Sequence, residues 1–197
     1  KWSFNTIPED EKHQGWAVAG PTWVGGERNG GGVWETAAID PQLGLLYIPV
    51  GNPFGDSTKR AGTNLFTDSV IALSLDTGTL KWYFQETHHD VWDYDSAAPP
   101  ILFDMDVRGQ RVKALAHASK NGWLYILNRE TAQPVHPTKE MPVPTAGARP
   151  GEQPWPTQPI PFTASGKPME PVCPVVPLEI PPEQLVNNKI VPQYTPM

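Results

Sequence analysis

The sequence predicts an all-β protein in which short antiparallel strands stack as repeated units. Three observations support this fold class. Short runs of Val, Ile, Leu and aromatic residues alternate with turn residues, no helical stripe exceeds two turns, and a tryptophan-containing phrase recurs along the chain. The 24 prolines and 17 glycines among the 197 residues also favour strands and loops over long helices.

Seven strands are expected in the first region of the chain, residues 1–133. Their ranges are 33–39, 44–50, 69–75, 80–85, 98–103, 113–118 and 123–127. Turn residues separate them, as at Asp40-Pro41, Asp76-Thr77-Gly78 and Lys120-Asn121-Gly122.

The second region, residues 134–197, contains 17 of the 24 prolines. Proline has no backbone N–H and cannot occupy central strands, so we expect a long loop with extended backbone, followed by the start of a further unit. Trp155, Phe162 and the apolar stretch 172–180 indicate that this loop is ordered and packs against other parts of the protein.

Internal repetition is the strongest architectural signal. Lys1-Trp2-Ser3-Phe4 recurs as Lys81-Trp82-Tyr83-Phe84, which ends the longer phrase 72–82, and a weaker relative lies at 126–132. In each phrase a strand enters a Thr-Gly-type turn, and the tryptophan is available to pack between units. This pattern is typical of β-propeller blades, with an ordinary antiparallel sandwich as the alternative. Because the beginning of the motif that ends at Trp2 is absent, we expect the chain to start within a blade.

Composition excludes several classes of function. A net charge of −6 argues against nucleic acid or an anionic membrane surface as the main partner. No apolar run approaches the roughly 20 residues that span a bilayer. The single cysteine, Cys173, excludes an internal disulfide framework and a cysteine-based zinc site.

Two loops with glycine are candidates for a binding site. Gly30-Gly31-Gly32-Val33-Trp34 allows close backbone approach to a flat or bulky group that could stack on Trp34, although a turn before a core tryptophan is an equal alternative. Asn52, in Gly51-Asn52-Pro53 after an apolar strand, offers an amide oxygen suited to a hard cation, but the motif is also a common turn.

The densest cluster of functional groups is His88-His89-Asp90-Val91-Trp92-Asp93-Tyr94-Asp95. Asp93 and Asp95 are two residues apart, so extended backbone would point both carboxylates the same way, toward a shared divalent ion. Transition-metal binding by the two histidines is an alternative, as is a solvated acidic loop, but oxygen ligation of calcium fits better because no third soft ligand is nearby. Lys120 is expected at the tip of a hairpin, where it matters only if the other loops converge beside it.

These motifs together resemble the quinoprotein alcohol and glucose dehydrogenases. The resemblance rests on the 88–95 cluster, on the phrase 72–82 before it and on Lys120-Asn121-Gly122 with Leu127-Asn128-Arg129 after it, and it covers essentially the whole chain. The family consists of eight-bladed propellers that use pyrroloquinoline quinone (PQQ), so the resemblance implies about three blades of four-stranded antiparallel sheets here. Ser74 departs from the family's usual Asp or Asn.

The resemblance also implies roles for individual residues. Trp34 would lie under the quinone plane, Asn52 would bind a Ca²⁺-type ion, and Asp93 would be the catalytic aspartate that also contacts the metal. Asp95 occupies a position that accompanies lanthanide use in some alcohol dehydrogenases of the family, but membrane glucose dehydrogenases share it, so Ca²⁺, Mg²⁺ and a lanthanide all stay open. Lys120 would donate a hydrogen bond to the quinone oxygen.

The expected function is hydride transfer from a sugar or alcohol hydroxyl to PQQ, with Asp93 as base and the metal as Lewis acid. Lys120 and the sequence His88-His89-Asp90 point to the membrane glucose or polyol branch, with glucose oxidised to gluconolactone. The alternatives are a PQQ-dependent alcohol dehydrogenase and, from another class, a non-catalytic propeller that binds proteins.

The resemblance further implies ubiquinone or a cytochrome c as electron acceptor and a periplasmic location. Association with the inner membrane would come through segments outside this chain. Because a propeller that lacks most of its blades leaves sheet faces open, we expect the isolated chain to be inactive.

Overall fold

A computed structural model describes residues 1–171 and Tyr194, and nearly all of its regular structure is β. This confirms the all-β prediction. Helical structure in the described part is limited to three short turns: α1 (Trp16–Ala19), η1 (Gly20–Thr22) and η2 (Ser57–Lys59). Over the same residues, we find no helix with the length and apolar character needed to cross a membrane. The stretch 172–180 lies outside the described residues.

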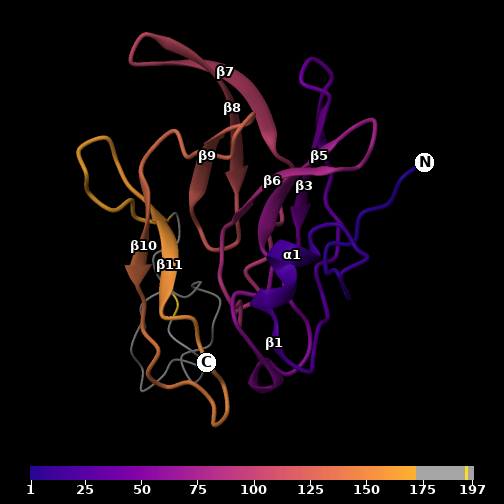
Figure 1. Ribbon diagram of the computed structural model, residues 1–197. Coiled ribbons are helices and arrows are strands. Elements are labelled where there is room, and N and C mark those ends of the chain that lie inside the picture. The colour runs from indigo at the N-terminus through magenta and orange to yellow at the C-terminus, as the bar shows by residue number, and fades with distance from the viewer. Residues whose placement is uncertain (172–193, 195–197) are drawn as a thin grey trace.

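Figure 1 shows two larger sheets side by side, with a hairpin on the side away from the N-terminus. The first sheet is a four-stranded antiparallel meander of β2 (Ala38–Asp40), β3 (Leu45–Val50), β5 (Ser69–Ser74) and β6 (Leu80–Gln85). The second contains β7 (Ile101–Val107), β8 (Gln110–Ala118) and β9 (Leu124–Asn128). Six of the seven predicted strands therefore form close to their expected ranges.

The predicted strand 33–39 is largely wrong, because the strand begins only at Ala38. The segment before it is diverted by hydrogen bonds from Gly31 N to Asn52 O and from Gly51 N to Gly32 O, both 2.9 Å long. These bonds tie the glycine segment to the end of β3, which leaves Trp34 outside the sheet.

Four strands were not predicted from the sequence. They form two separate antiparallel ribbons, β1 (Val24–Gly25) with β4 (Arg60–Ala61) and β10 (Thr138–Pro142) with β11 (Thr157–Pro161). The second ribbon lies in the region expected to be a loop. Proline is tolerated there because both strands of a two-stranded ribbon are edge strands.

The sequence repeat is also a repeat in the structure. The turn after β5 is closed by a hydrogen bond from Gly78 N to Ser74 O at 2.8 Å, and the turn after β9 by one from Ala132 N to Asn128 O at 2.9 Å. Gly78 and Ala132 both have left-handed backbone, with φ of 68° and 65°. The weaker phrase 126–132 thus has the same turn geometry as the stronger one.

Two tryptophans contact these turns at equivalent positions. Trp2 Nε1 donates to Leu75 O at 2.9 Å, and Trp82 Nε1 donates to Arg129 O at 3.1 Å. Leu75 and Arg129 each lie three residues before the left-handed residue of their turn. Trp82 belongs to an apolar cluster that also includes residues of the three-stranded sheet. It therefore packs between neighbouring units, which confirms the expected role.

Candidate active site

Loops from both larger sheets bring the sequence-predicted site residues together. Asn52 follows β3, Asp93 and Asp95 lie in the loop after β6, and Lys120 follows β8. Asn52 Nδ2 donates to Asp93 Oδ1 at 2.8 Å, and Asn52 N donates to Asp95 Oδ1 at 2.9 Å. Residues that are 41 and 43 positions apart in sequence thus become direct neighbours.

Lys120 completes this arrangement from the second sheet. Its Nζ donates to Asp95 Oδ2 at 2.6 Å and to Asp93 Oδ2 at 3.1 Å. Burial by itself lowers the pKa of Lys120, but its hydrogen bonds to Asp95 and Asp93 and their charges outweigh that effect and raise the pKa. The ammonium group is therefore charged at neutral pH and lies between two carboxylates.

Asp93 and Asp95 differ strongly in exposure. The Asp95 side chain is 7% exposed and that of Asp93 is 68% exposed. Each Asp95 oxygen already accepts a hydrogen bond, from Asn52 N or from Lys120 Nζ. Asp95 therefore forms the buried base of the site, which we call its floor, while the carboxylate of Asp93 faces solvent.

Gly51 allows the floor to close around Asp95. A Cβ atom at this position would lie 2.7 Å from Asp95 Oδ1 and 3.0 Å from Trp34 Nε1, so a side chain does not fit. Gly30 serves a similar purpose, because a Cβ there would lie 2.3 Å from Asn52 O. The glycine segment thus makes its close approach to the chain's own backbone.

Trp34 is 57% exposed, so it is not the core tryptophan of the alternative interpretation. Its indole edge lies beside Gly51 and Asp95, and most of its surface is open. A flat ligand could therefore stack on the open part of this ring.

Asp90 shapes the loop that carries Asp93. Its Oδ1 accepts from Trp92 N and its Oδ2 from Tyr94 N, both at 2.7 Å. Burial raises the pKa of Asp90 to about 6, although these two backbone hydrogen bonds act in the opposite direction. Asp90 therefore fixes the backbone of this loop, a role that was not predicted from the sequence.

The two histidines face different partners. His89 is buried and its Nδ1 lies 3.0 Å from Gly62 O, while burial and nearby Arg60 lower its pKa to about 4. His88 Nδ1 lies 2.7 Å from Gln85 Oε1. The idea that the pair binds one transition metal has no support in this geometry.

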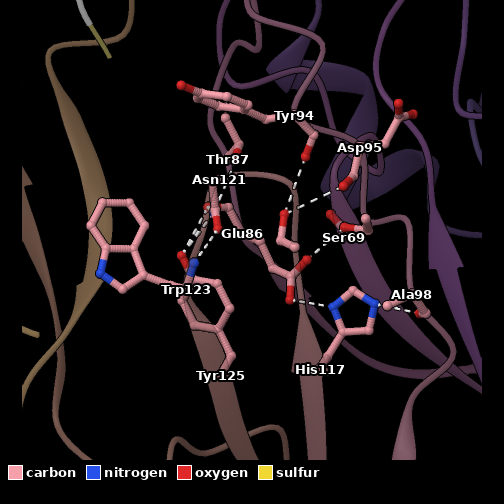
Figure 2. A network of polar contacts seen from close by, with 12 residues as sticks. Ser69, Glu86, Thr87, Tyr94, Asp95, Ala98, His117, Asn121, Trp123 and Tyr125 are labelled. Carbon is pink, nitrogen blue, oxygen red and sulfur yellow. Dashed lines mark hydrogen bonds and ion pairs between the residues drawn. The ribbon is translucent and has the colours of Figure 1, made fainter. Parts of the chain in front are cut away.

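A buried polar network lies behind the site (Figure 2). His117 Nδ1 is 2.7 Å from Glu86 Oε1, and His117 Nε2 donates to Ala98 O at 2.7 Å. Both side chains are fully buried. Burial works to lower the pKa of His117, but the Glu86 charge raises it overall. Glu86 Oε2 also accepts from Ser96 Oγ at 2.6 Å, so Glu86 connects β8, which leads to Lys120, with the loop that carries Asp95.

Neither His117 nor Glu86 was predicted from the sequence to belong to the site. A histidine within an apolar strand is a signal that could have been used, because a buried imidazole needs a hydrogen-bonding partner. The partner is 31 residues away, so sequence alone does not identify it.

The donor set fits part of a hard-cation site. Asn52 and the exposed Asp93 supply an amide and a carboxylate, the oxygen ligands that calcium prefers. Calcium takes six to eight oxygen ligands, and no group of three or more acidic, histidine or cysteine side chains suited to a metal occurs among residues 1–171 and Tyr194. Asn52 and Asp93 would therefore be two ligands of a larger set, and Asp95 as a metal ligand stays a prediction.

Comparison with known families gives one match that covers most of the chain. Residues 1–179 match the family described as glucose/ethanol/alcohol dehydrogenase, β-propeller domain, PQQ. Quinoprotein glucose dehydrogenase of Gluconobacter oxydans (strain 621H) is 40% identical over 133 residues, covering 64% of this chain and 16% of that protein.

Quinohemoprotein alcohol dehydrogenase ADH-IIG of Pseudomonas putida is 40% identical over 144 residues, which are 67% of this chain and 20% of that protein. Its solved structure matches with a TM-score of 0.63 at 32% identity, covering 85% of this chain and 25% of that one. A europium-containing methanol dehydrogenase matches with a TM-score of 0.56 at 35% identity, covering 61% and 21%. The chain spans about a fifth of the length of the curated relatives it matches.

Proposed function

The chain belongs to the PQQ-dependent alcohol and glucose dehydrogenase β-propeller family, and from this premise we propose that it supplies the catalytic base and part of the cofactor site of such an enzyme. The membership confirms the resemblance seen in the sequence. The observation that carries the proposal is the contact of Asn52 and Lys120 with the exposed carboxylate of Asp93.

Asp93 is the base in this proposal. Asn52 Nδ2 donates to Oδ1 and Lys120 Nζ donates to Oδ2, so the carboxylate is held in one orientation from two sides. Its exposure leaves lone pairs open on the outer side, where a substrate hydroxyl can bind and give its proton to the carboxylate. Lys120 also compensates the negative charges of Asp93 and Asp95, which stabilises two acids at close range.

Trp34 and Asn52 form the proposed cofactor side of the site. The open face of Trp34 would stack against a flat ring system, and Asn52 with Asp93 would bind the metal. When bound, PQQ supplies a two-electron acceptor and the metal supplies a Lewis acid. Lys120 would donate a charged hydrogen bond to a quinone oxygen.

The substrate is proposed to be an alcohol, polyol or sugar hydroxyl. Lys120 and His88-His89-Asp90 favour glucose as a specific candidate, whereas the matched relatives include both alcohol and glucose dehydrogenases. Ubiquinone or a cytochrome c as electron acceptor and a periplasmic site at the inner membrane belong to the same proposal. The electron acceptor and the location are proposed on the basis of the sequence resemblance alone.

Replacement of Asp93 with Asn tests the proposal in the complete protein that carries this chain. We expect turnover to fall by at least about 10²-fold, the lower range of general-base contributions, because the amide cannot take the proton. Binding of PQQ, followed by its absorbance, is expected to change much less. The assay is dye reduction with glucose, glycerol and ethanol, which also ranks the substrates. Turnover close to that of the unmodified protein would refute Asp93 as the base.

A further inference from the structure

The hairpin formed by β10 and β11, with its connecting loop, contacts both loops that meet at the candidate site. We call this segment, residues 138–161, the brace. One contact involves Gln158, which is fully buried. Its Oε1 accepts from His88 N and its Nε2 donates to His88 O, both at 2.8 Å. This double hydrogen bond holds the backbone at the start of the loop that carries Asp93.

The His88 ring adds a second contact with the brace. Its Nε2 lies 3.0 Å from Glu140 Oε1, and Glu140 Oε2 accepts from Thr157 Oγ1 at 2.7 Å. The His88 side chain is 15% exposed. Both the backbone and the ring of His88 are therefore held by residues of β10 and β11.

The far end of the brace contacts the loop that follows Asn52. Glu152 has a side chain that is only 2% exposed, and its Oε1 accepts from Ser57 Oγ at 2.5 Å. Ser57 is buried and begins η2, five residues after Asn52. Arg149 strengthens the contact, because its Nη2 also donates to Ser57 Oγ and lies 3.6 Å from Asp56 Oδ1.

The brace adds a further buried link between two loops that also meet directly, through Asn52 N with Asp95 Oδ1 and through Arg60 Nη2 with Asp90 O. The hydrogen bond from Asn52 Nδ2 to Asp93 Oδ1 lies at the surface, where water competes for both groups. The brace joins the same two loops through buried polar groups and a segment that is stiffened by proline. The prolines between its two contact points are Pro154 and Pro156.

We propose that the brace fixes the separation of the Asn52 and Asp93 loops, with Gln158 and Glu152 as its positioning residues. The inference rests on the proposed function only in that these loops carry the metal ligands and the base. Gln158 and Glu152 touch neither group; they act through His88 and Ser57.

The first test replaces Gln158 with Met in the complete protein, which removes both hydrogen bonds to His88 at similar size. Gln153→Met is the matched control, because Gln153 is exposed on the same segment. Ca²⁺ is titrated into the protein without PQQ, and dye reduction is measured with PQQ and Ca²⁺. We expect roughly 10-fold weaker Ca²⁺ binding, the low end for loss of an outer contact at a metal site, and a lower kcat with KM within about threefold.

Glu152 gives an independent test at the other end of the brace, and it decides the matter if Gln158→Met does not fold. Glu152→Leu should weaken Ca²⁺ binding roughly 10-fold. Glu152→Gln should weaken it less, because it retains an acceptor for Ser57 Oγ and loses only the oxygen that accepts from Arg149 N. Assays are run below the unfolding midpoint of each variant, so that global unfolding does not imitate the effect.

The outcomes separate the two proposals. If Asp93→Asn is inactive but Gln158→Met and Glu152→Leu match the Gln153→Met control in Ca²⁺ affinity and kcat, the brace is refuted and the proposed function stands. Lower kcat at unchanged Ca²⁺ affinity also refutes the brace. If Asp93→Asn stays active while the brace variants lose Ca²⁺ affinity, the proposed base is wrong and the brace stands.

Discussion

Asp68 is a carboxyl group for which the proposed mechanism has no use. It is fully buried, and neither of its oxygens has a hydrogen-bonding partner in the described part of the chain. Burial, together with the nearby charges of Asp90 and Asp95, raises its pKa well above the usual value for an aspartic acid. Folding therefore favours the protonated form of Asp68.

The raised pKa of Asp68 predicts that Asp68→Asn stabilises the complete protein at pH values above the pKa of the unfolded state. Below the pKa of the unfolded state, near 4, both states are protonated and the substitution changes little. Above it, the unfolded state ionises while the folded state stays protonated, so stability falls by up to about 1.4 kcal/mol per pH unit until the folded pKa is reached. An asparagine at this position does not ionise, so its stability does not fall in this way. It also tolerates the left-handed backbone of Asp68, where φ is 51°.

Unfolding midpoints of both proteins between pH 4 and pH 8 check the prediction. The gap between them should widen in favour of Asp68→Asn as pH rises. A gap that is constant with pH would show that Asp68 is not protonated in the folded state.

Membership in the site could be predicted from the sequence for residues that lie in short motifs rich in functional groups. Asn52, Asp93 and Lys120 stand in loops of polar residues and glycine, and the structure brings them into contact. Gln158 and Glu152 lie in an unremarkable proline-rich stretch. Their partners are 70 and 95 residues away, so only the folded chain reveals them.

Secondary-structure elements were predictable where strands alternate with glycine and aspartate turns. The ribbon of β10 and β11 was missed because proline content argues against central strands and says little about isolated edge strands. In the register, Pro142 pairs with Thr157 and Pro159 pairs with Glu140. The division of the chain at residue 133 stays a prediction.

The turn that contacts Trp2 gives a prediction about these elements. Gly78→Ala should destabilise the complete protein by roughly 2 kcal/mol or more, because φ is 68° and a Cβ would lie 2.4 Å from the Trp2 ring. Gly109→Ala is the matched control, since φ is 81° there and no atom lies within 4 Å. It should cost only about 1–2 kcal/mol of backbone strain.

Unfolding midpoints in urea measure both substitutions, and a Trp2→Ala background removes the ring. In that background, Gly78→Ala and Gly109→Ala should lower the free energy of unfolding by similar amounts. A larger loss for Gly78→Ala that persists without the ring would contradict the proposed packing of Trp2 on this turn.

At the scale of the whole molecule, the 197 residues leave large apolar side chains open on both larger sheets. Exposed examples are Ile39 at 57% on β2, Ile101 at 65% on β7 and Leu124 at 50% on β9. Propeller units bury such faces only against neighbouring units. The repeat that ends at Trp2 predicted that the chain consists of propeller units with open faces. Which side chains lie on those faces could not be predicted from the sequence.

These open faces, and the small number of oxygen donors at the site, predict that the 197 residues alone do not catalyse the reaction. With PQQ and Ca²⁺ added, the isolated chain should give no dye reduction above a protein-free control, while the complete protein does. One reason is that the two ligand residues, Asn52 and Asp93, supply too few oxygens for a cation that takes six to eight. The other is that Trp34 contacts only one face of a flat cofactor, whose opposite face would stay exposed to water. Isolated Asp93→Asn chain serves as the second control. Asp93-dependent dye reduction by the isolated chain would show that these residues form a sufficient site by themselves.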